Sequence, residues 1–163
     1  MNANDMPRFV VSGLLSPATV ELRLRGSNRD EVLQELVDKI PQFARDPGAK
    51  QTLFRALQER ELLCSTGVGD GVALPHARNA LVGLVEQPAI VFGRHEPGIS
   101  FGALDDFPAR LFFLLVAPNV SQHLQVLARL SRMLRDPLLR QNLLQADRAE
   151  KAIALIREAE ANW

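Results

Sequence analysis

The strongest constraint on the fold is a run of seven consecutive apolar residues, from Leu111 to Ala117. Seven residues match the length of an ordinary β-strand and fall far short of the ~20 that a membrane-spanning helix requires. A strand that is apolar at every position buries both of its faces. The segment from Arg110 to Ala117 therefore predicts a central strand of a sheet, and Pro88 to Gly93 predicts a second strand.

The rest of the chain alternates between strand and helix patterns. Apolar and polar residues alternate from Val20 to Arg25, which indicates a third strand. Helices are expected at five places: after a cap at Ser27 or Asn28 and up to Ile40, from about Ala49 to Leu62, from Ser121 to Leu134, from Asp136-Pro137 onward, and after a cap at Asp147. Strands mixed with helices throughout predict an α/β layered domain. We expect a single domain over residues 1–163, with its core at about residues 14–158.

The composition excludes several classes of protein. Lysine plus arginine balance aspartate plus glutamate at 19 each, so a broad basic surface for nucleic acid or a membrane is not expected. The single cysteine, Cys64, permits no intramolecular disulfide, which fits a reducing compartment. The first residues carry Asp5 and lack a clear small-residue cleavage site, unlike a signal peptide. We therefore expect a cytoplasmic protein that neither binds nucleic acid nor inserts into a membrane.

His76 is the residue best placed for chemistry. Three glycines at alternate positions, Gly67, Gly69 and Gly71, let the backbone turn sharply before the short apolar run Val72-Ala73-Leu74. Pro75-His76 follow that run and therefore lie at the end of an expected strand, where open α/β sheets bind ligands. Neutral imidazole is nucleophilic, and its ordinary pKa of ~6.5 keeps the neutral form available. His76 is thus either a nucleophile for phosphoryl transfer or a histidine that fills a turn.

Two further residues are candidates for the same site. His123 lies in or near the first turn of the helix expected from Ser121, where unpaired backbone donors and the positive end of the helix dipole hold phosphate well. Arg60 continues an inward stripe formed by Leu53, Leu57 and then Cys64, and its planar guanidinium matches phosphate oxygens. The alternatives are a surface histidine and an arginine whose stem covers the core while its head lies in water.

Other chemistry-bearing residues carry weaker signals. His95 follows Arg94 at the end of a strand and is expected at the surface, and Cys64 is expected to be a small buried hydrophobic residue. The histidines and the cysteine show no metal-ligand spacing, and the three glycines match neither dinucleotide nor Walker spacing. We therefore expect no metal and no cofactor.

The segment from Glu61 to Ala77 resembles the active-site signature of the fructose/mannitol-type enzyme IIA proteins of the bacterial phosphotransferase system. The shared positions are the acidic Glu61, then Val68-Gly69, Val72-Ala73-Leu74, Pro75-His76 and the small Ala77. The likeness continues at Phe101-Gly102, at the strand from Arg110 and at His123-Leu124. Many relatives carry glycine where this chain has Ala77, and the following Arg78 either adds positive charge for a partner or is merely solvated.

The resemblance implies a fold and a set of roles. It implies a mixed β-sheet sandwiched between α-helices, with His76 as the phosphorylated histidine and His123 and Arg60 as its active-site companions. It implies a phosphocarrier protein of the HPr type as the phosphoryl donor, and no metal. Two proteins must then meet face to face, so the site is expected in a shallow, partly apolar depression with Val68, Leu74 and Phe101 as rim candidates.

Three functions follow from the resemblance. The first is a phosphohistidine-carrying regulatory protein like the stand-alone nitrogen-regulatory IIA branch, which alters its binding to a target protein on phosphorylation. The second is a transport-linked subunit that passes phosphate to a separate IIB protein for fructose- or mannitol-type uptake. The third is a binding module that keeps the fold and transfers no phosphate.

Overall fold

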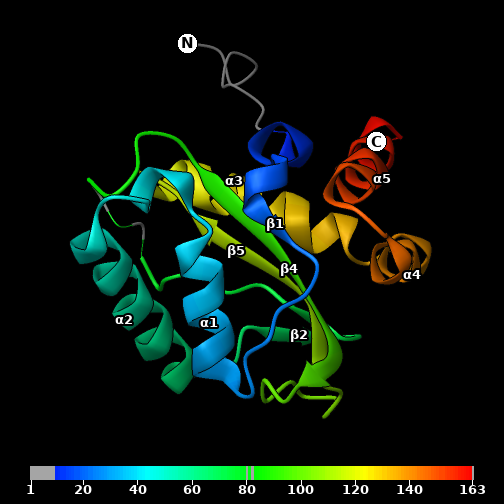
Figure 1. Ribbon diagram of the computed structural model, residues 1–163, viewed down its shortest axis with the longest axis horizontal. Helices are drawn as coiled ribbons and strands as arrows, with labels where there is room; N and C mark the ends of the chain where they lie inside the picture. Colours follow the sequence, from blue (N-terminus) through cyan, green and yellow to red (C-terminus); the bar gives the residue numbers. More distant parts are fainter. Residues whose placement is uncertain (1–9, 80, 82, 163) are drawn as a thin grey trace.

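The computed structural model describes residues 10–79, 81 and 83–162, which form a five-stranded mixed sheet between two layers of helices (Figure 1). The strands are β1 (Val20–Glu21), β2 (Gly67–Gly69), β3 (Val72–Ala73), β4 (Ala89–Ile99) and β5 (Ala109–Val116), in the order β1-β4-β5-β3-β2. Strand β5 is the middle strand, and seven of its eight residues are buried. The prediction of a central strand at this run of apolar residues is confirmed, as is the α/β sandwich.

Each face of the sheet has its own helices and its own core. Helices α1 (Arg29–Asp38) and α2 (Pro47–Leu63), with the 3₁₀ turn Pro41–Phe43, cover one face. Helices α3 (Val120–Met133), α4 (Pro137–Gln145) and α5 (Ala149–Ala161), with the 3₁₀ turn Val11–Leu14, cover the other. A third 3₁₀ turn, Pro17–Thr19, leads into β1. None of the helices in the described ranges is long and apolar enough to span a bilayer.

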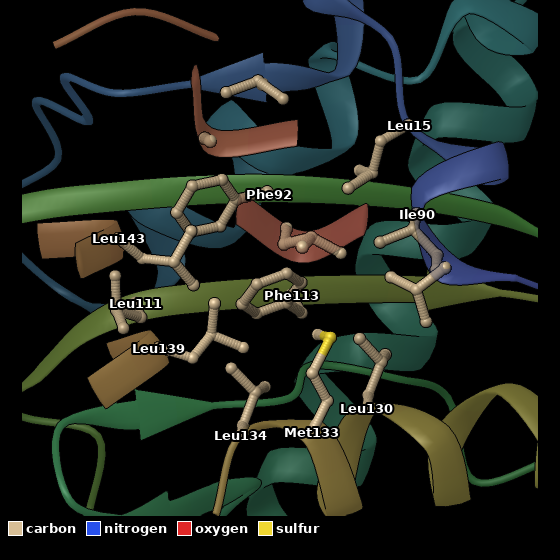
Figure 2. Packing of buried hydrophobic residues seen from close by; sticks show 14 of the residues in the cluster. Leu15, Ile90, Phe92, Leu111, Phe113, Leu130, Met133, Leu134, Leu139 and Leu143 are labelled. Atoms are coloured by element: carbon tan, nitrogen blue, oxygen red, sulfur yellow. The ribbon is translucent and has the colours of Figure 1, made fainter. Parts of the chain in front are cut away.

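The core beneath α3 and α4 is centred on two aromatic rings. Phe92 of β4 and Phe113 of β5 stack with their ring centroids 4.7 Å apart, and both are fully buried. Figure 2 shows Leu130 and Met133 of α3 closing over Phe113. This layer holds α3 against β5, so the first turn of α3 is fixed relative to the end of that strand.

The turn between β2 and β3 explains the alternating glycines. Gly69, Asp70 and Gly71 have φ angles of 90°, 55° and 77°, a left-handed path that favours glycine. Beyond this turn β3 pairs in parallel with β5, with Val72 opposite Leu111. The chain keeps following β5 after β3 ends, because the Leu115 N–H donates to the Pro75 carbonyl at 3.0 Å and His76 forms an isolated bridge with Leu115.

Side chains that bond to the backbone set two of the observed boundaries. The strand expected over 20–25 ends at Glu21, where the Arg23 N–H donates to the Glu21 carboxylate at 3.0 Å. The Leu24 N–H still donates to the Arg94 carbonyl of β4, and the N–H groups of Arg25 and Gly26 donate to the carboxylate of Glu35 in α1. Helix α2 begins at Pro47, two residues before the expected start, because the Asp46 carboxylate caps it by accepting from Ala49 N–H. Strand β4 also continues to Ile99, six residues beyond its predicted end.

The last three helices confirm one predicted cap and correct another. The buried face of α3 consists of His123, Val126, Leu130 and Met133, and Leu124 is exposed. Asp147 does not cap α5, whose N-cap is Arg148 without a side-chain bond. The cap and first-position proline predicted at Asp136-Pro137 are confirmed, since Asp136 accepts from Leu138 N–H.

Candidate functional site

His76 lies directly beyond β3 with its ring held by the backbone. Its Nδ1 is 2.6 Å from the carbonyl oxygen of Leu74. Because a carbonyl oxygen can only accept, Nδ1 carries the proton in this contact and Nε2 keeps its lone pair. Pro75 separates the two residues and restricts the backbone between them. The ring therefore presents a neutral nucleophilic nitrogen from a fixed position.

His123 faces His76 from the first turn of α3. The two ring centroids are 5.4 Å apart with the planes inclined at 60°, and His123 is only 8% exposed. Asn119 caps α3 by accepting from the Gln122 N–H at 2.9 Å, which fixes where this turn begins. The helix thus brings a second imidazole and the positive end of its dipole towards His76.

Arg60 lies in the last turn of α2 and is half-buried. Its guanidinium donates to the carbonyl of Cys64, which lies just past the end of the helix. Arg60 lines an open depression of about 410 Å³ together with Leu63 and with Ala77, Arg78 and Asn79, the residues that follow His76. Two guanidinium groups, an amide and the carboxylate of Glu59 therefore border the surface next to the histidine pair.

Burial keeps both histidines neutral. It lowers the pKa of His76 below its ordinary value. The bond to Leu74 opposes this shift, while the charge that His123 carries when it is protonated, and then the charge of Arg60, add to it. Burial also lowers the pKa of His123. At neutral pH both rings are therefore uncharged, so His76 is available as a nucleophile and His123 can donate one N–H.

Sequence reasoning gave no role to Glu61, which is buried at the end of α2. The inward stripe of this helix is Leu53, Leu57 and Glu61, four residues apart, and not the predicted continuation through Arg60 to Cys64. The Glu61 carboxylate accepts both from the backbone N–H of Thr66 at 3.0 Å and from its hydroxyl. Burial raises the pKa of Glu61, and the two bonds from Thr66 oppose that shift. The four-residue spacing was the signal that could have revealed this position.

Several other predictions about single residues were wrong. His95 is buried, because its Nε2 donates to the Gly26 carbonyl at 2.9 Å and its Nδ1 accepts from the Gly98 N–H at 3.1 Å. Cys64 is exposed, since α2 ends before it. Of the three rim candidates, Val68 is exposed, whereas Leu74 and Phe101 are buried.

Comparisons with known proteins all indicate the same family. Residues 13–159 match the family model described as phosphoenolpyruvate-dependent sugar phosphotransferase system, EIIA 2. The fructose-specific EIIABC component of Bacillus subtilis is 33% identical over 150 residues, 91% of this chain but 23% of that protein. The nitrogen regulatory protein of Bradyrhizobium diazoefficiens is 33% identical over 145 residues, 88% of this chain and 91% of that protein.

Solved structures give the same picture. The nitrogen regulatory protein IIA-Ntr of Neisseria meningitidis superimposes with a TM-score of 0.79 at 27% identity, covering 91% of this chain and 99% of that one. The enzyme IIA mannitol protein of Escherichia coli, solved in complex with its phosphorylated IIB protein, has a TM-score of 0.75 at 22% identity over 88% of this chain and 97% of that one. The second likeness shows the fold alone.

Proposed function

The chain belongs to the EIIA 2 family of the phosphoenolpyruvate-dependent sugar phosphotransferase system, and from this premise we propose that His76 receives a phosphoryl group from an HPr-type carrier. The bond that carries the proposal is the one from His76 Nδ1 to the Leu74 carbonyl. It leaves Nε2 as the nucleophile, on a ring that faces His123 at 5.4 Å. We propose that the phosphorylated and free forms bind a regulatory target differently.

The transfer is a displacement at phosphorus between two imidazoles. The lone pair of His76 Nε2 attacks the phosphorus of the donor's phosphohistidine, the P–N bond to the donor breaks, and the donor nitrogen keeps that electron pair. His76 becomes an N-phosphorylated imidazolium, because its Nδ1 proton is still present. The Leu74 carbonyl accepts a hydrogen bond from Nδ1–H, with 2.6 Å between nitrogen and oxygen, and so stabilises the positive charge that the ring acquires.

Arg60 and His123 would stabilise the phosphoryl oxygens during transfer. Positioning and electrostatic stabilisation account for most of the catalysis of phosphoryl transfer. Arg60 offers a charged planar fork from the end of α2, and His123 offers one N–H from the first turn of α3. Because both are anchored to helices, little reorganisation is needed when the group arrives.

The exposed apolar side chains beside the site suit a protein partner. Leu63 borders the depression that contains Arg60, and Val120 and Leu124 are on the turns of α3 that carry His123. Each of the three is more than half exposed. A carrier protein that docks here would cover them and exclude water from the transferring group.

Labelling with phosphate tests the assignment of His76. The protein is incubated with labelled phosphoenolpyruvate, enzyme I and a cognate HPr-type carrier, and acid-labile label is counted. We expect label on the wild type and on His95→Gln, whose amide can still donate to the Gly26 carbonyl away from the site. We expect none on His76→Ala. Label that persists on His76→Ala, or no labelling with any cognate carrier, would refute the proposal.

A second candidate function is phosphate transfer to a separate IIB protein. The E. coli enzyme IIA mannitol protein was solved with phosphorylated IIB, and one relative is fructose-specific. Against this, the likeness to a nitrogen regulatory protein extends over about nine tenths of both chains. Adding fructose- or mannitol-type IIB proteins to the labelled chain separates the two: rapid loss of label to IIB indicates transport, whereas retention with phosphate-dependent binding to a non-IIB target indicates regulation.

A further inference from the structure

We propose that Glu61 is a positioning residue for His76, acting through Thr66 and the Leu74 backbone. It would fix the orientation and the tautomer of the His76 ring without touching the phosphoryl group. This inference deepens the proposed function and rests on it, because a fixed tautomer matters only if His76 is a nucleophile. Three consecutive hydrogen-bonded steps connect the carboxylate to the ring.

The first step joins the end of α2 to the segment that follows it. Glu61 is 7% exposed and Thr66 is 3% exposed. One carboxylate oxygen accepts from the Thr66 N–H at 3.0 Å, and the other accepts from the Thr66 hydroxyl. Both donors belong to one residue, so the pair leaves Thr66 no freedom to rotate.

The remaining steps run from Thr66 to the ring. The Thr66 carbonyl accepts from the Leu74 N–H at 3.0 Å, and the Leu74 carbonyl accepts from His76 Nδ1 at 2.6 Å. On the other side, the Leu115 N–H holds the Pro75 carbonyl at 3.0 Å. The backbone that orients the ring is therefore tied to the central strand on one side and to Glu61 on the other.

The position of Glu61 would suit an apolar residue equally well on packing grounds. It continues the buried stripe of Leu53 and Leu57, where a carboxylate costs desolvation that leucine would not. The bonds from Thr66 and the positive charges of Arg29 and Arg60 offset that cost, since each lowers the carboxylate's pKa. The desolvation cost of a carboxylate at this position is explained if its bonds fix Thr66, because Thr66 in turn fixes the backbone that carries the Leu74 carbonyl.

The tautomer of His76 in the free protein is the decisive measurement. Long-range ¹H–¹⁵N correlation spectra of ¹⁵N-histidine-labelled protein distinguish a proton on Nδ1 from one on Nε2. We expect the Nδ1–H form in the wild type. In Glu61→Gln the charge is lost and the amide keeps one acceptor oxygen, so the Thr66 hydroxyl must turn from donor to acceptor. Thr66→Val removes the hydroxyl while keeping the side-chain shape. In both we expect the Nε2–H form to appear and kcat for transfer to fall about tenfold to hundredfold, with KM for the carrier unchanged.

Two controls separate positioning from general destabilisation. Glu158→Gln makes the same charge change at an exposed site on α5 and should leave the tautomer and kcat unchanged. Thr66→Ser keeps the hydroxyl and should retain the Nδ1–H form. The proposal is overturned if the wild type carries its proton on Nε2, if folded Glu61→Gln and Thr66→Val keep the wild-type tautomer, or if neither variant folds, since Glu61 would then serve the fold alone. The spectra need no carrier, so a failure of phosphorylation would overturn the proposed function and leave the tautomer result intact.

Discussion

Replacing His123 by alanine tests whether the second histidine serves the phosphoryl group or only fills the core. The ring is 8% exposed, and its centroid is 5.4 Å from that of His76. A phosphoryl group on His76 Nε2 would therefore lie within reach of a His123 N–H. His123→Ala removes that donor and opens space beside His76 to water.

The expected loss follows from this geometry. A hydrogen bond to a charged group contributes about 1.5–3 kcal/mol. If His123 is protonated once the phosphate is present, opposite unit charges about 5 Å apart attract by about 3 kcal/mol at an effective dielectric constant of ~20. Both routes give a decrease in transfer rate of roughly tenfold to 150-fold.

Rapid-quench measurement of transfer from the phosphorylated carrier provides the assay. His123→Gln is the matched variant, because its amide keeps a neutral donor and should recover most of the rate. A second readout is the pKa of His76, which His123→Ala should raise, since burial lowers that pKa most and the charge of His123 lowers it further. A folded His123→Ala protein that transfers phosphate within twofold of the wild type, with an unchanged His76 titration, would refute the reasoning.

Three further predictions concern charge. Arg60→Ala should slow transfer about 100-fold or more, and Arg60→Lys should restore only part of the rate because an ammonium group cannot bind two oxygens as a planar fork; single-turnover kinetics check both. Folding lowers the pKa of His76 and of His123, so the unfolded chain takes up protons first as the pH falls. The free energy of unfolding should therefore be fully retained above pH ~6.5 and decrease below it. Denaturant titrations between about pH 8 and pH 5 would show this decrease. Glu160→Ala removes a buried carboxylate that accepts from the Val11 and Ser12 N–H groups at 2.7 and 2.8 Å, so it should lower the free energy of unfolding by about 2–4 kcal/mol in urea titrations without changing phosphate transfer.

Local patterns carried most of the prediction of the fold. The apolar run at 111–117 identified the central strand because burial on both faces leaves no polar alternative. A helix start at Ser27 or Asn28, of which Asn28 is the observed cap, and another at Asp136 followed from capping chemistry, which involves residues two or three apart. Predictions failed where a distant side chain took over a backbone group, as Glu35 does at Arg25.

The site was predictable by residue type and not by arrangement. Pro75-His76 after a short strand indicated the candidate nucleophile, and a helix start indicated His123, but their 5.4 Å separation depends on how β3 pairs with β5. His95 was expected at the surface because nothing in its neighbourhood reveals that the Gly26 carbonyl, far away in sequence, lies against it. Both results depend on contacts between distant segments, which short-range periodicity does not encode.

The pairing of β3 with β5 also decides whether the site exists. Strand β3 has only two residues, yet it sets the bridge between His76 and Leu115, and β5 leads within a few residues to the Asn119 cap and His123. A slip of one residue in this pairing would move His76 by about 3.3 Å and turn its ring to the opposite face of the sheet. So short a strand contributes few hydrogen bonds of its own to hold that register. The bonds from Leu115 to Pro75 and from Leu74 to Thr66 add two more constraints on the same backbone, and Thr66 in turn donates to the buried Glu61 carboxylate. On our proposal, the polar Glu61 in an otherwise apolar stripe is the means by which α2 fixes the orientation of the His76 ring.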